Sequence, residues 1–292
     1  MNRGSTPDEI GAGAAFEHRI VVGFDGSPSA DSTIEWAARE AVARSVPLWF
    51  VACFGPAPTV DDSSVSAGHR KQIADAMDVT GRRHPELRIQ HATPHPDQRD
   101  ALLEASSGAD LLIIAGSSPA TVRHWLLGSV PRAAARRSAC PVIVVRGRPR
   151  PHVRRIVVGI DASSAAASAL DWAIAEAECH GSELSIVHAL RSPRVAGRSL
   201  RASDLDRTDA QCVVDLAIRR CEKRTSLPLS GELIEGEAAA VLTAASEHAD
   251  LLAVGSRGRS GYKTMLFGSV ALIVAEQAGC PVAVIHPRVS SQ

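Results

Sequence analysis

The sequence predicts an α/β protein made of two tandem domains, each a doubly wound parallel sheet of about five strands. Two observations carry this prediction. The chain has 292 residues, about twice the length of a domain of roughly 150 residues. The same motifs also occur twice, and within each copy short apolar runs alternate with helix-length segments, which is typical of sheets covered by helices on both faces.

The repeat consists of five motifs that recur in the same order. Residues 19–27 (RIVVGFDGS) return 136 positions later as residues 155–163 (RIVVGIDAS). The other pairs are 34–37 with 170–173, 109–117 with 249–256, 128–130 with 268–270, and 140–145 with 280–285. A period near 140 residues is too long for a solenoid unit, so it indicates one domain that is present twice.

These motifs divide the chain into four predicted parts. We expect a disordered N-terminal arm at 1–17, a first domain at 18–146, a linker at 147–153 and a second domain at 154–288. Residues 146–155 contain two prolines and five arginines, which favours an extended, solvated linker. A basic arm that binds nucleic acid is the alternative, and the short run and the balanced net charge argue against it.

Strands and helices can be assigned from periodicity. Helix-length segments cover residues 29–44 and 164–180, and Gly181 is a good stop signal for the second. The predicted strands of the first copy are nearly all apolar, as buried parallel strands should be: residues 20–24, 48–53, 111–115 and 142–145.

Ligands of such sheets bind beyond the carboxyl ends of the strands, where the strand order reverses. The loops to search therefore follow Asp25 and Asp161 on the first strands, and Gly116 and Gly255 on the fourth strands.

Composition narrows the class of partner. Lys and Arg together number 32, as do Asp and Glu, so the net charge is zero, and aromatic residues make up 3%. We expect no nucleic-acid partner. No apolar run approaches the 18 or more residues of a membrane helix, and no secretory signal is recognisable at the start. Six cysteines without a C-x-x-C pair favour reduced thiols and a cytoplasmic protein.

The loop of the second copy (residues 255–270, GSRGRSGYKTMLFGSV) suits an anion. Glycines allow the backbone to approach a ligand, and successive N–H groups can form a nest for phosphate oxygens. Gly268 and Ser269 open the next helix, whose N-terminus favours negative charge. Asp161 would face the same crevice and could accept hydrogen bonds from a ribose or a base. Glycines in a strand-to-helix turn that binds nothing are the structural alternative. Basic side chains nearby come from Arg257, Arg259 and Lys263.

The segment Gly255-x2-Gly258-x9-Gly268-Ser269 resembles the G-x2-G-x9-G-[S/T] signature of the universal stress protein family, and the repeated motifs extend this resemblance over nearly the whole chain. It implies a Rossmann-like fold of the adenine nucleotide alpha-hydrolase type, binding of ATP with Mg²⁺, and a regulatory role in the stress response. Carried over to this chain, it implies nucleotide contacts from Gly159, Ile160, Asp161, Ala162, Val187 or Ala189, Val254, Gly255, Arg257, Gly258, Gly268, Ser269 and Val270.

The first copy departs from the signature. Its counterparts of the nucleotide-binding residues are Asp25, Gly116, Gly128, Ser129 and Val130. Counted from Gly116, the loop is one residue short, proline stands at 119 in place of the second glycine, and Ser118 replaces the arginine. Because proline has no N–H to offer an anion, we expect the second domain to bind most of the nucleotide.

In the family, domains pair through their last strands. Residues 141–145 and 281–285 could do this within one chain, and a homodimer is also possible.

No catalytic or metal site is expected from the sequence. There is no G-x-S-x-G elbow and no P-loop. His91 and His95 have the spacing of a helical metal pair, but Pro94 and Pro96 would break a helix there. His188 is expected to be a packed histidine. Slow ATP hydrolysis, adenylyl transfer and a nucleotide-free interaction module remain alternatives to ATP binding.

Overall fold

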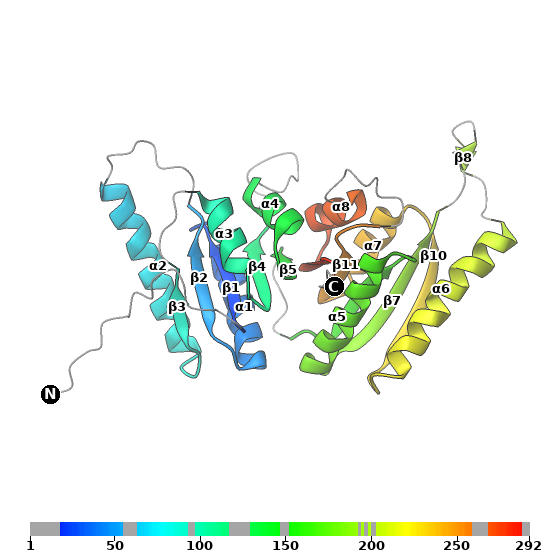
Figure 1. Ribbon diagram of the computed structural model, residues 1–292, viewed down its shortest axis with the longest axis horizontal. Coiled ribbons are helices and arrows are strands. Elements are labelled where there is room, and N and C mark those ends of the chain that lie inside the picture. The colour runs from blue at the N-terminus through cyan, green and yellow to red at the C-terminus, as the bar shows by residue number, and fades with distance from the viewer. Residues whose placement is uncertain are drawn as a thin grey trace, which may run out of the picture.

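A computed structural model places the two halves of the chain side by side (Figure 1). The structure describes residues 18–54, 63–92, 97–116, 129–146, 152–191, 194–195, 198–199, 203–258 and 268–287. The predicted arm at 1–17 and most of the predicted linker lie outside these residues. Within the described ranges, the helices are too short or too polar to cross a membrane.

The strands form one ten-stranded sheet and one small hairpin. The large sheet has the order β10-β7-β6-β11-β12-β5-β4-β1-β2-β3. Its strands are β1 (Ile20–Phe24), β2 (Leu48–Ala52), β3 (Ile89–His91), β4 (Leu111–Ala115), β5 (Val142–Val145), β6 (Arg155–Ile160), β7 (Glu183–Leu190), β10 (Leu229–Glu235), β11 (Leu251–Gly255) and β12 (Val282–Ile285), and the hairpin is β8 (Arg194–Val195) with β9 (Arg198–Ser199).

Every strand pair of the large sheet within a half is parallel, and the halves meet at the antiparallel pair β5–β12. Val142 lies opposite Val284, and Val144 opposite Val282. The predicted pairing of the last strands within one chain is therefore present, and each half contributes five strands in the doubly wound order. In each half the order reverses beside the first strand, between β1 and β4 and between β6 and β11.

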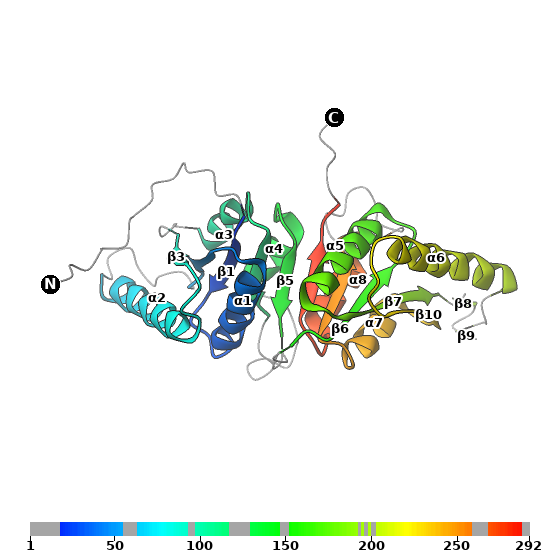
Figure 2. The same cartoon turned by 90° about the horizontal axis from the view of Figure 1, so that it is seen from below.

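Helices cover both faces of the sheet, because the strand side chains point alternately to the two sides. Ile20 and Val22 pack in the core under α1, α2, α5 and α6, whereas Val21 packs in the core under α3, α4, α7 and α8. Figure 2 shows the first of these faces. The helices are α1 (Ala30–Arg44), α2 (Ser63–Arg83), α3 (Gln98–Ser106), α4 (Ser129–Arg137), α5 (Ser164–His180), α6 (Asp204–Glu222), α7 (Ala238–Ser246) and α8 (Ser269–Gln277).

The helix boundaries follow from local side-chain chemistry. The Ser163 side chain accepts a hydrogen bond from the Ala166 N–H, which caps α5, and Gly181 ends the helix with a φ of 63°. Ser203 and Asp206 form a capping box at the start of α6. β3 has no comparably clear sequence signal, because it has three residues and no fully buried side chain.

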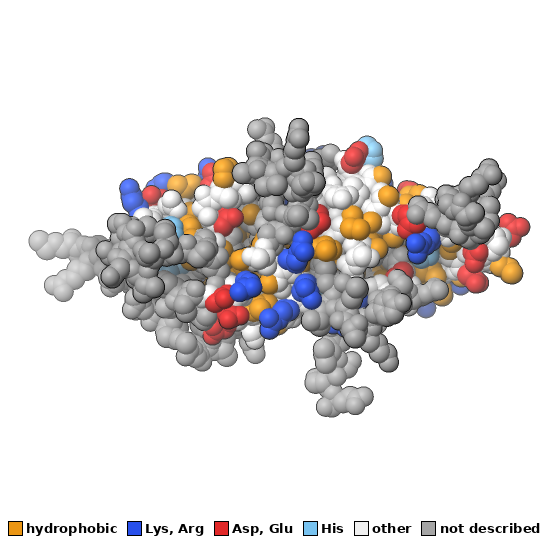
Figure 3. All heavy atoms as spheres, turned by 90° about the horizontal axis from the view of Figure 1, so that it is seen from above, with side chains coloured by type: hydrophobic (Ala, Val, Ile, Leu, Met, Phe, Trp, Pro, Cys, Tyr) orange, Lys and Arg blue, Asp and Glu red, His pale blue; other side chains and the backbone are white. Residues whose placement is uncertain are grey.

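The seam between the halves also carries charged side chains on the α4 and α8 face. Figure 3 shows basic side chains near the middle of this face. Arg132 lies 3.1 Å from Glu276, and buried Arg146 donates to the carbonyl of Ala275, 2.9 Å away, at the end of α8. A cation is favourable at a helix C-terminus. Burial lowers the pKa of the Arg146 guanidinium, although Glu276 acts in the opposite direction.

Candidate functional site

The candidate site lies at the carboxyl ends of β6 and β11, which are neighbours at the reversal point of the second half. Asp161 directly follows β6, and Ser256, Arg257 and Gly258 directly follow β11. Parallel strands deliver both loops to the same edge, so the sequence-predicted elements of the site converge. Residues 259–267, which include Arg259 and Lys263, lie outside the described part of the chain.

The two loops are joined by hydrogen bonds around Asp161. Its Oδ1 accepts from the Ser163 N–H at 2.9 Å, and Ser163 Oγ donates to the Arg257 carbonyl at 3.4 Å. The Asp161 carboxylate is partly exposed and Arg257 is exposed. The Ser163 side chain therefore links the loop after β6 to the loop after β11.

Two glycines of the signature stand where a side chain would collide. A Cβ on Gly255 would lie 2.6 Å from the backbone carbon of Ala165, in the first turn of α5. A Cβ on Gly258 would lie 3.0 Å from Asp161 Oδ2. Gly255 therefore serves close packing of β11 against α5, whereas Gly258 keeps the space beside the carboxylate open.

The third glycine opens α8. Gly268 is the N-cap residue of this helix, and it has no side chain to cap the first N–H groups. Its own N–H donates to the Ser256 carbonyl at 2.8 Å, which holds the helix start against the loop. Ser269 is exposed, and Val270 packs partly into the core. The uncapped N–H groups of the first turn are therefore available to an anion.

The apolar side of the crevice is formed by β6, β7 and β11. Val187, Ala189 and Val254 belong to the same core cluster, under α7 and α8. Leu242 of α7 occupies the space beside Gly159, because a Cβ there would lie 2.7 Å from a Leu242 methyl group. His188 points elsewhere: its Nδ1 is 2.7 Å from the Ile160 carbonyl, so it is a hydrogen-bonded histidine, as predicted. Ala162 is exposed.

Comparison with known proteins decides the family. The sequence model of the universal stress protein family matches residues 17–146 and again residues 152–286. The chain belongs to the universal stress protein family. Both halves are therefore universal stress protein domains, as the repeated motifs indicate.

Relatives share this tandem arrangement over nearly their full length. One universal stress protein of Mycobacterium tuberculosis is 31% identical, with 91% of this chain and 95% of the relative covered. One of Mycolicibacterium smegmatis is 26% identical, with 94% and 99% covered. A crystal structure of a universal stress protein from Archaeoglobus fulgidus has a TM-score of 0.69 at 19% identity, covering 92% of this chain and 98% of that one, which supports the Rossmann-like fold. A shorter universal stress protein in complex with cAMP covers 47% of this chain and 99% of its own, at 24% identity and a TM-score of 0.39.

The structure of the first universal stress protein domain corrects the residue-by-residue match between the first and the second loop. The Gly116 N–H donates to the Val145 carbonyl, and the Ser256 N–H donates to the Ile285 carbonyl. Donors and acceptors are both 140 residues apart, as are the starts of α4 and α8. Gly116 is therefore the counterpart of Ser256, and the two loops have the same length.

The counterpart of Gly255 is Ala115. The expectation that the first loop is one residue short was wrong. It rested on pairing Gly116 with Gly255, whereas the strand hydrogen bonds pair Ala115 with Gly255 and leave no difference in loop length. Counted in the observed register, Ser118 stands in place of the second glycine and Ser117 in place of Arg257. The first domain thus lacks the counterparts of both Gly255 and Gly258.

Other residues of the first domain lie largely as their counterparts in the second domain do. Asp25 Oδ1 accepts from the Ser27 N–H at 3.0 Å, as in the second domain, and Ser129 and Val130 again begin a helix. Arg146 packs on Gly116, where a Cβ would lie 2.8 Å from its Cγ. Gly128 and Pro119 lie outside the described residues, as do His95 and its two neighbouring prolines.

Sequence reasoning missed two polar groups beside the second loop. Ser256 is fully buried, and among the described residues neither its Oγ nor the buried Nε2 of His286 has a hydrogen-bond partner. Burial lowers the pKa of His286, and the charge of Arg257 lowers it further. His286 directly follows β12, so its position after a strand was the signal that could have revealed it.

Proposed function

We propose that this universal stress protein binds ATP with Mg²⁺ through its second domain and acts as a nucleotide-responsive regulator in the stress response. The observation that carries this proposal is the convergence of Asp161, the open backbone at Gly258 and the uncapped start of α8 at Gly268. These three features surround one crevice and differ in chemistry, as the parts of a nucleotide do.

Each of these features suits a different part of the nucleotide: the phosphates, the ribose or the adenine. N–H groups at the start of α8 and of the glycine loop suit phosphate oxygens. The Arg257 guanidinium adds a cation that suits bidentate contact with a phosphate. Asp161 suits a ribose hydroxyl, because a carboxylate is a strong acceptor of hydrogen bonds. Val187, Ala189 and Val254 give the apolar wall on which adenine would pack.

Magnesium would arrive with the triphosphate. Mg²⁺ keeps several waters and is commonly held by substrate phosphates with one or two carboxylates, so the site does not need a set of protein ligands for this ion. Asp161 is the carboxylate beside the loop, and it fits this role as well as contact with a ribose.

Equilibrium dialysis of the full-length protein with labelled Mg-ATP tests the proposal. We expect about one ATP per chain, and strong loss of binding in Gly258→Val, whose side chain would occupy the space beside Asp161. Gly68→Val is the matched control, because this exposed glycine of α2 has nothing within 4 Å of an added Cβ. Equal binding by wild type and Gly258→Val would show that the glycine loop is not the site. Unlabelled cAMP in the same dialysis reports whether a monophosphate competes.

Binding without turnover is part of the proposal. A time course of ADP and AMP release should stay below about one event per minute, which is slow against typical turnover of about 10 per second. Faster release that is lost in Asp161→Asn would assign the protein to enzymes instead.

A further inference from the structure

Two buried glutamates face each other where α1 of the first domain meets α5 of the second. Glu40 and Glu176 are 136 residues apart, so they are the same position of the repeated domain. Their side chains are 2% and 1% exposed. Carboxylates at this depth require positive partners, and both sit on the approximate two-fold axis that relates the halves.

The partners are two further equivalent residues, Arg44 and His180. His180 Nε2 is 3.1 Å from Glu40 Oε1 and 3.3 Å from Glu176 Oε1. Arg44 approaches from the other side: its Nε is 3.4 Å from Glu40 Oε2, and its Nη2 contacts Glu176 Oε2. Glu176 thus turns one oxygen to the arginine and the other to the imidazole, whereas both oxygens of Glu40 lie near the imidazole, at 3.1 and 3.3 Å from His180 Nε2.

His180 Nε2 carries at most one hydrogen atom, so it cannot donate a full hydrogen bond to Glu40 and to Glu176 at the same time. Glu176 Oε1 is buried and has no hydrogen-bond partner among the described residues, although it lies 3.3 Å from His180 Nε2. The two carboxylates and the Arg44 guanidinium together carry one net negative charge, which a second positive group at His180 Nε2, either a proton or a metal ion, can balance.

We propose that Glu40, Glu176 and His180 form a binding site for a divalent transition-metal ion, with Zn²⁺ as the ion that fits best. Within the described residues, one ligand atom from each of these three lies within 4.8 Å of the others. Zn²⁺ binds imidazole nitrogen and carboxylate oxygen at about 2.0–2.2 Å, which places tetrahedral ligand atoms about 3.3–3.5 Å apart. The distances from His180 Nε2 to Glu40 Oε1 and to Glu176 Oε1, 3.1 and 3.3 Å, are close to this separation between ligand atoms.

The ion would replace the Nε2 proton rather than join it. His180 Nε2 would donate its lone pair to Zn²⁺, and the proton would leave to solvent, as ligand binding by histidine requires. Arg44 would stay on the Oε2 atoms of both glutamates as the group that orients them. The other described side chains around the cluster would keep their present positions.

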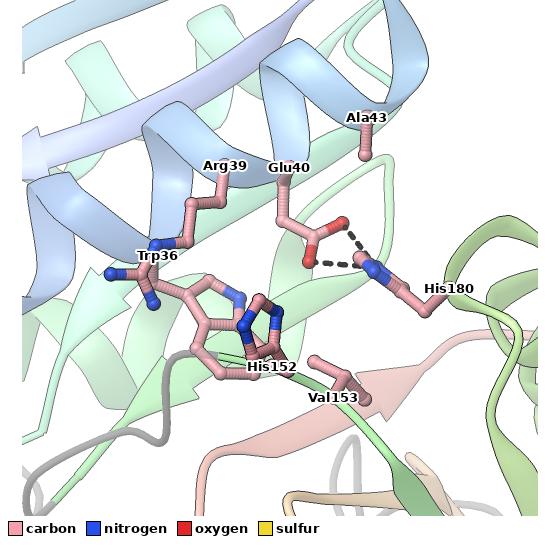
Figure 4. A pocket seen from close by; sticks show the side chains of 7 residues that line it. All are labelled: Trp36, Arg39, Glu40, Ala43, His152, Val153 and His180. Atoms are coloured by element: carbon pink, nitrogen blue, oxygen red, sulfur yellow. Dashed lines mark hydrogen bonds and ion pairs between the residues drawn. The ribbon is translucent and has the colours of Figure 1, made fainter. Parts of the chain in front are cut away.

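A cavity beside the cluster provides the fourth position. It has a volume of about 320 Å³ and is shown in Figure 4, with His180 directed toward Glu40 at one end. Trp36 lines the same cavity; it is 3% exposed, and its buried Nε1 has no hydrogen-bond partner among the described residues. An unpartnered indole N–H indicates an acceptor in the cavity. A water or hydroxide on the ion fits this position and would complete four-coordination.

Zinc titration of the chelator-treated, full-length protein tests the site. All variants carry Cys179→Ser, since this exposed cysteine adjoins His180. We expect the parent to bind one more Zn²⁺ than His180→Gln, with release of one proton, and to give the visible spectrum of four-coordinate Co²⁺ when cobalt replaces zinc. Mg²⁺ should not compete, because it prefers six oxygen ligands.

His84→Gln is the matched control. His84 Nε2 lies 3.4 Å from Glu35 Oε2 and so forms a similar pair with a single carboxylate of α1; it should bind zinc like the parent. Equal stoichiometry in the parent and in folded His180→Gln would overturn the proposal, as would a parent that retains no ion at micromolar free Zn²⁺. If the variant does not fold, the zinc-edge anomalous signal of parent crystals decides: a peak among the three ligands supports the site, and its absence overturns it.

Discussion

The two universal stress protein domains share strand order, register and a first-strand aspartate, and they differ at the turn where β4 or β11 meets the next loop. In the second domain, Gly255 lets β11 pack directly on the first turn of α5. In the first domain the same position is Ala115, and α1 begins at Ala30, the counterpart of Ala166, two residues later than α5. The later start fits the extra methyl group of Ala115.

The two domains therefore differ at a strand end and not in the strand itself. β4 and β11 have the same length and the same pairing, so the sheet accepts either alanine or glycine at this position. The difference beyond the strands is the start of the neighbouring helix, which comes two residues later in the first domain. Ligands of such sheets bind at this edge, so we expect the two domains to differ in nucleotide binding.

The largest expected effect comes from giving the second domain the residue of the first. Gly255→Ala should lower ATP affinity by about a hundredfold or more, because the added Cβ would lie 2.6 Å from the backbone of Ala165 and overpacking displaces backbone. Isothermal titration calorimetry measures this. Gly279→Ala is the control, since its Cβ would have ordinary contacts of 3.5 Å or more, and its affinity should equal that of the wild type. Wild-type affinity in Gly255→Ala would show that the close packing is irrelevant to binding.

The aspartates give the next effect. Asp161→Ala should weaken ATP binding roughly 10- to 100-fold, since hydrogen bonds to charged groups contribute about 1.5–3 kcal/mol. Asp25→Ala should change it by less than about twofold, because the first loop lacks both glycines. Both proteins can be compared by dialysis at equal concentration. Equal losses would mean that the two domains bind nucleotide alike.

Restoring the signature in the first domain should add a site. Ala115→Gly, Ser117→Arg and Ser118→Gly together recreate the Gly-x-Arg-Gly order of the second loop. We expect the number of bound ATP molecules to rise from about one to about two per chain, measured by mass analysis of the nucleotide retained after gel filtration. Ser118→Gly alone should leave it near one. A triple variant that still binds one would place the difference outside the loop.

The smallest effect concerns thiol reactivity, which differs between the buried and the exposed cysteines. Burial raises the pKa of Cys53 to about 12 and of Cys140 to about 11. At pH 8 the thiolate fraction of Cys140 is then about 0.1%, and only the thiolate reacts. Cys179 and Cys212 of the second domain are exposed. Iodoacetamide at pH 8 should therefore label these two at least tenfold faster, as peptide mass spectrometry would show. Labelling of Cys140 at the same rate would indicate that the first domain opens readily.

Much of the fold could be predicted because strand and helix signals agree along the chain. The predicted runs at β1, β4 and β5 coincide with the strands, and α5 spans the predicted 164–180. β3 escaped assignment because it has three residues and no full burial. The seam was predictable only from the family resemblance, since an apolar strand does not specify its partner.

The candidate site was predictable in its parts and not in its register. Asp161 and Gly258 were assigned from spacing, and the structure brings them together. Matching Gly116 with Gly255 failed because two adjacent small residues, Ala115 and Gly116, fit one motif position, and the strand hydrogen bonds show that Ala115 is the counterpart of Gly255. The buried cluster of Glu40, Glu176 and His180 could not be predicted from the sequence, because it forms only where helices of the two domains pack together.

The antiparallel seam has a consequence for any attempt to separate the domains. β5 (Val142–Val145) is fully buried, and β12 covers its open edge. Residues 18–146 alone would expose a bare apolar strand with open backbone groups, which favours aggregation or pairing with a second copy. In the duplicated chain the second domain covers this edge, so the two halves can pair without being identical and their loops can differ.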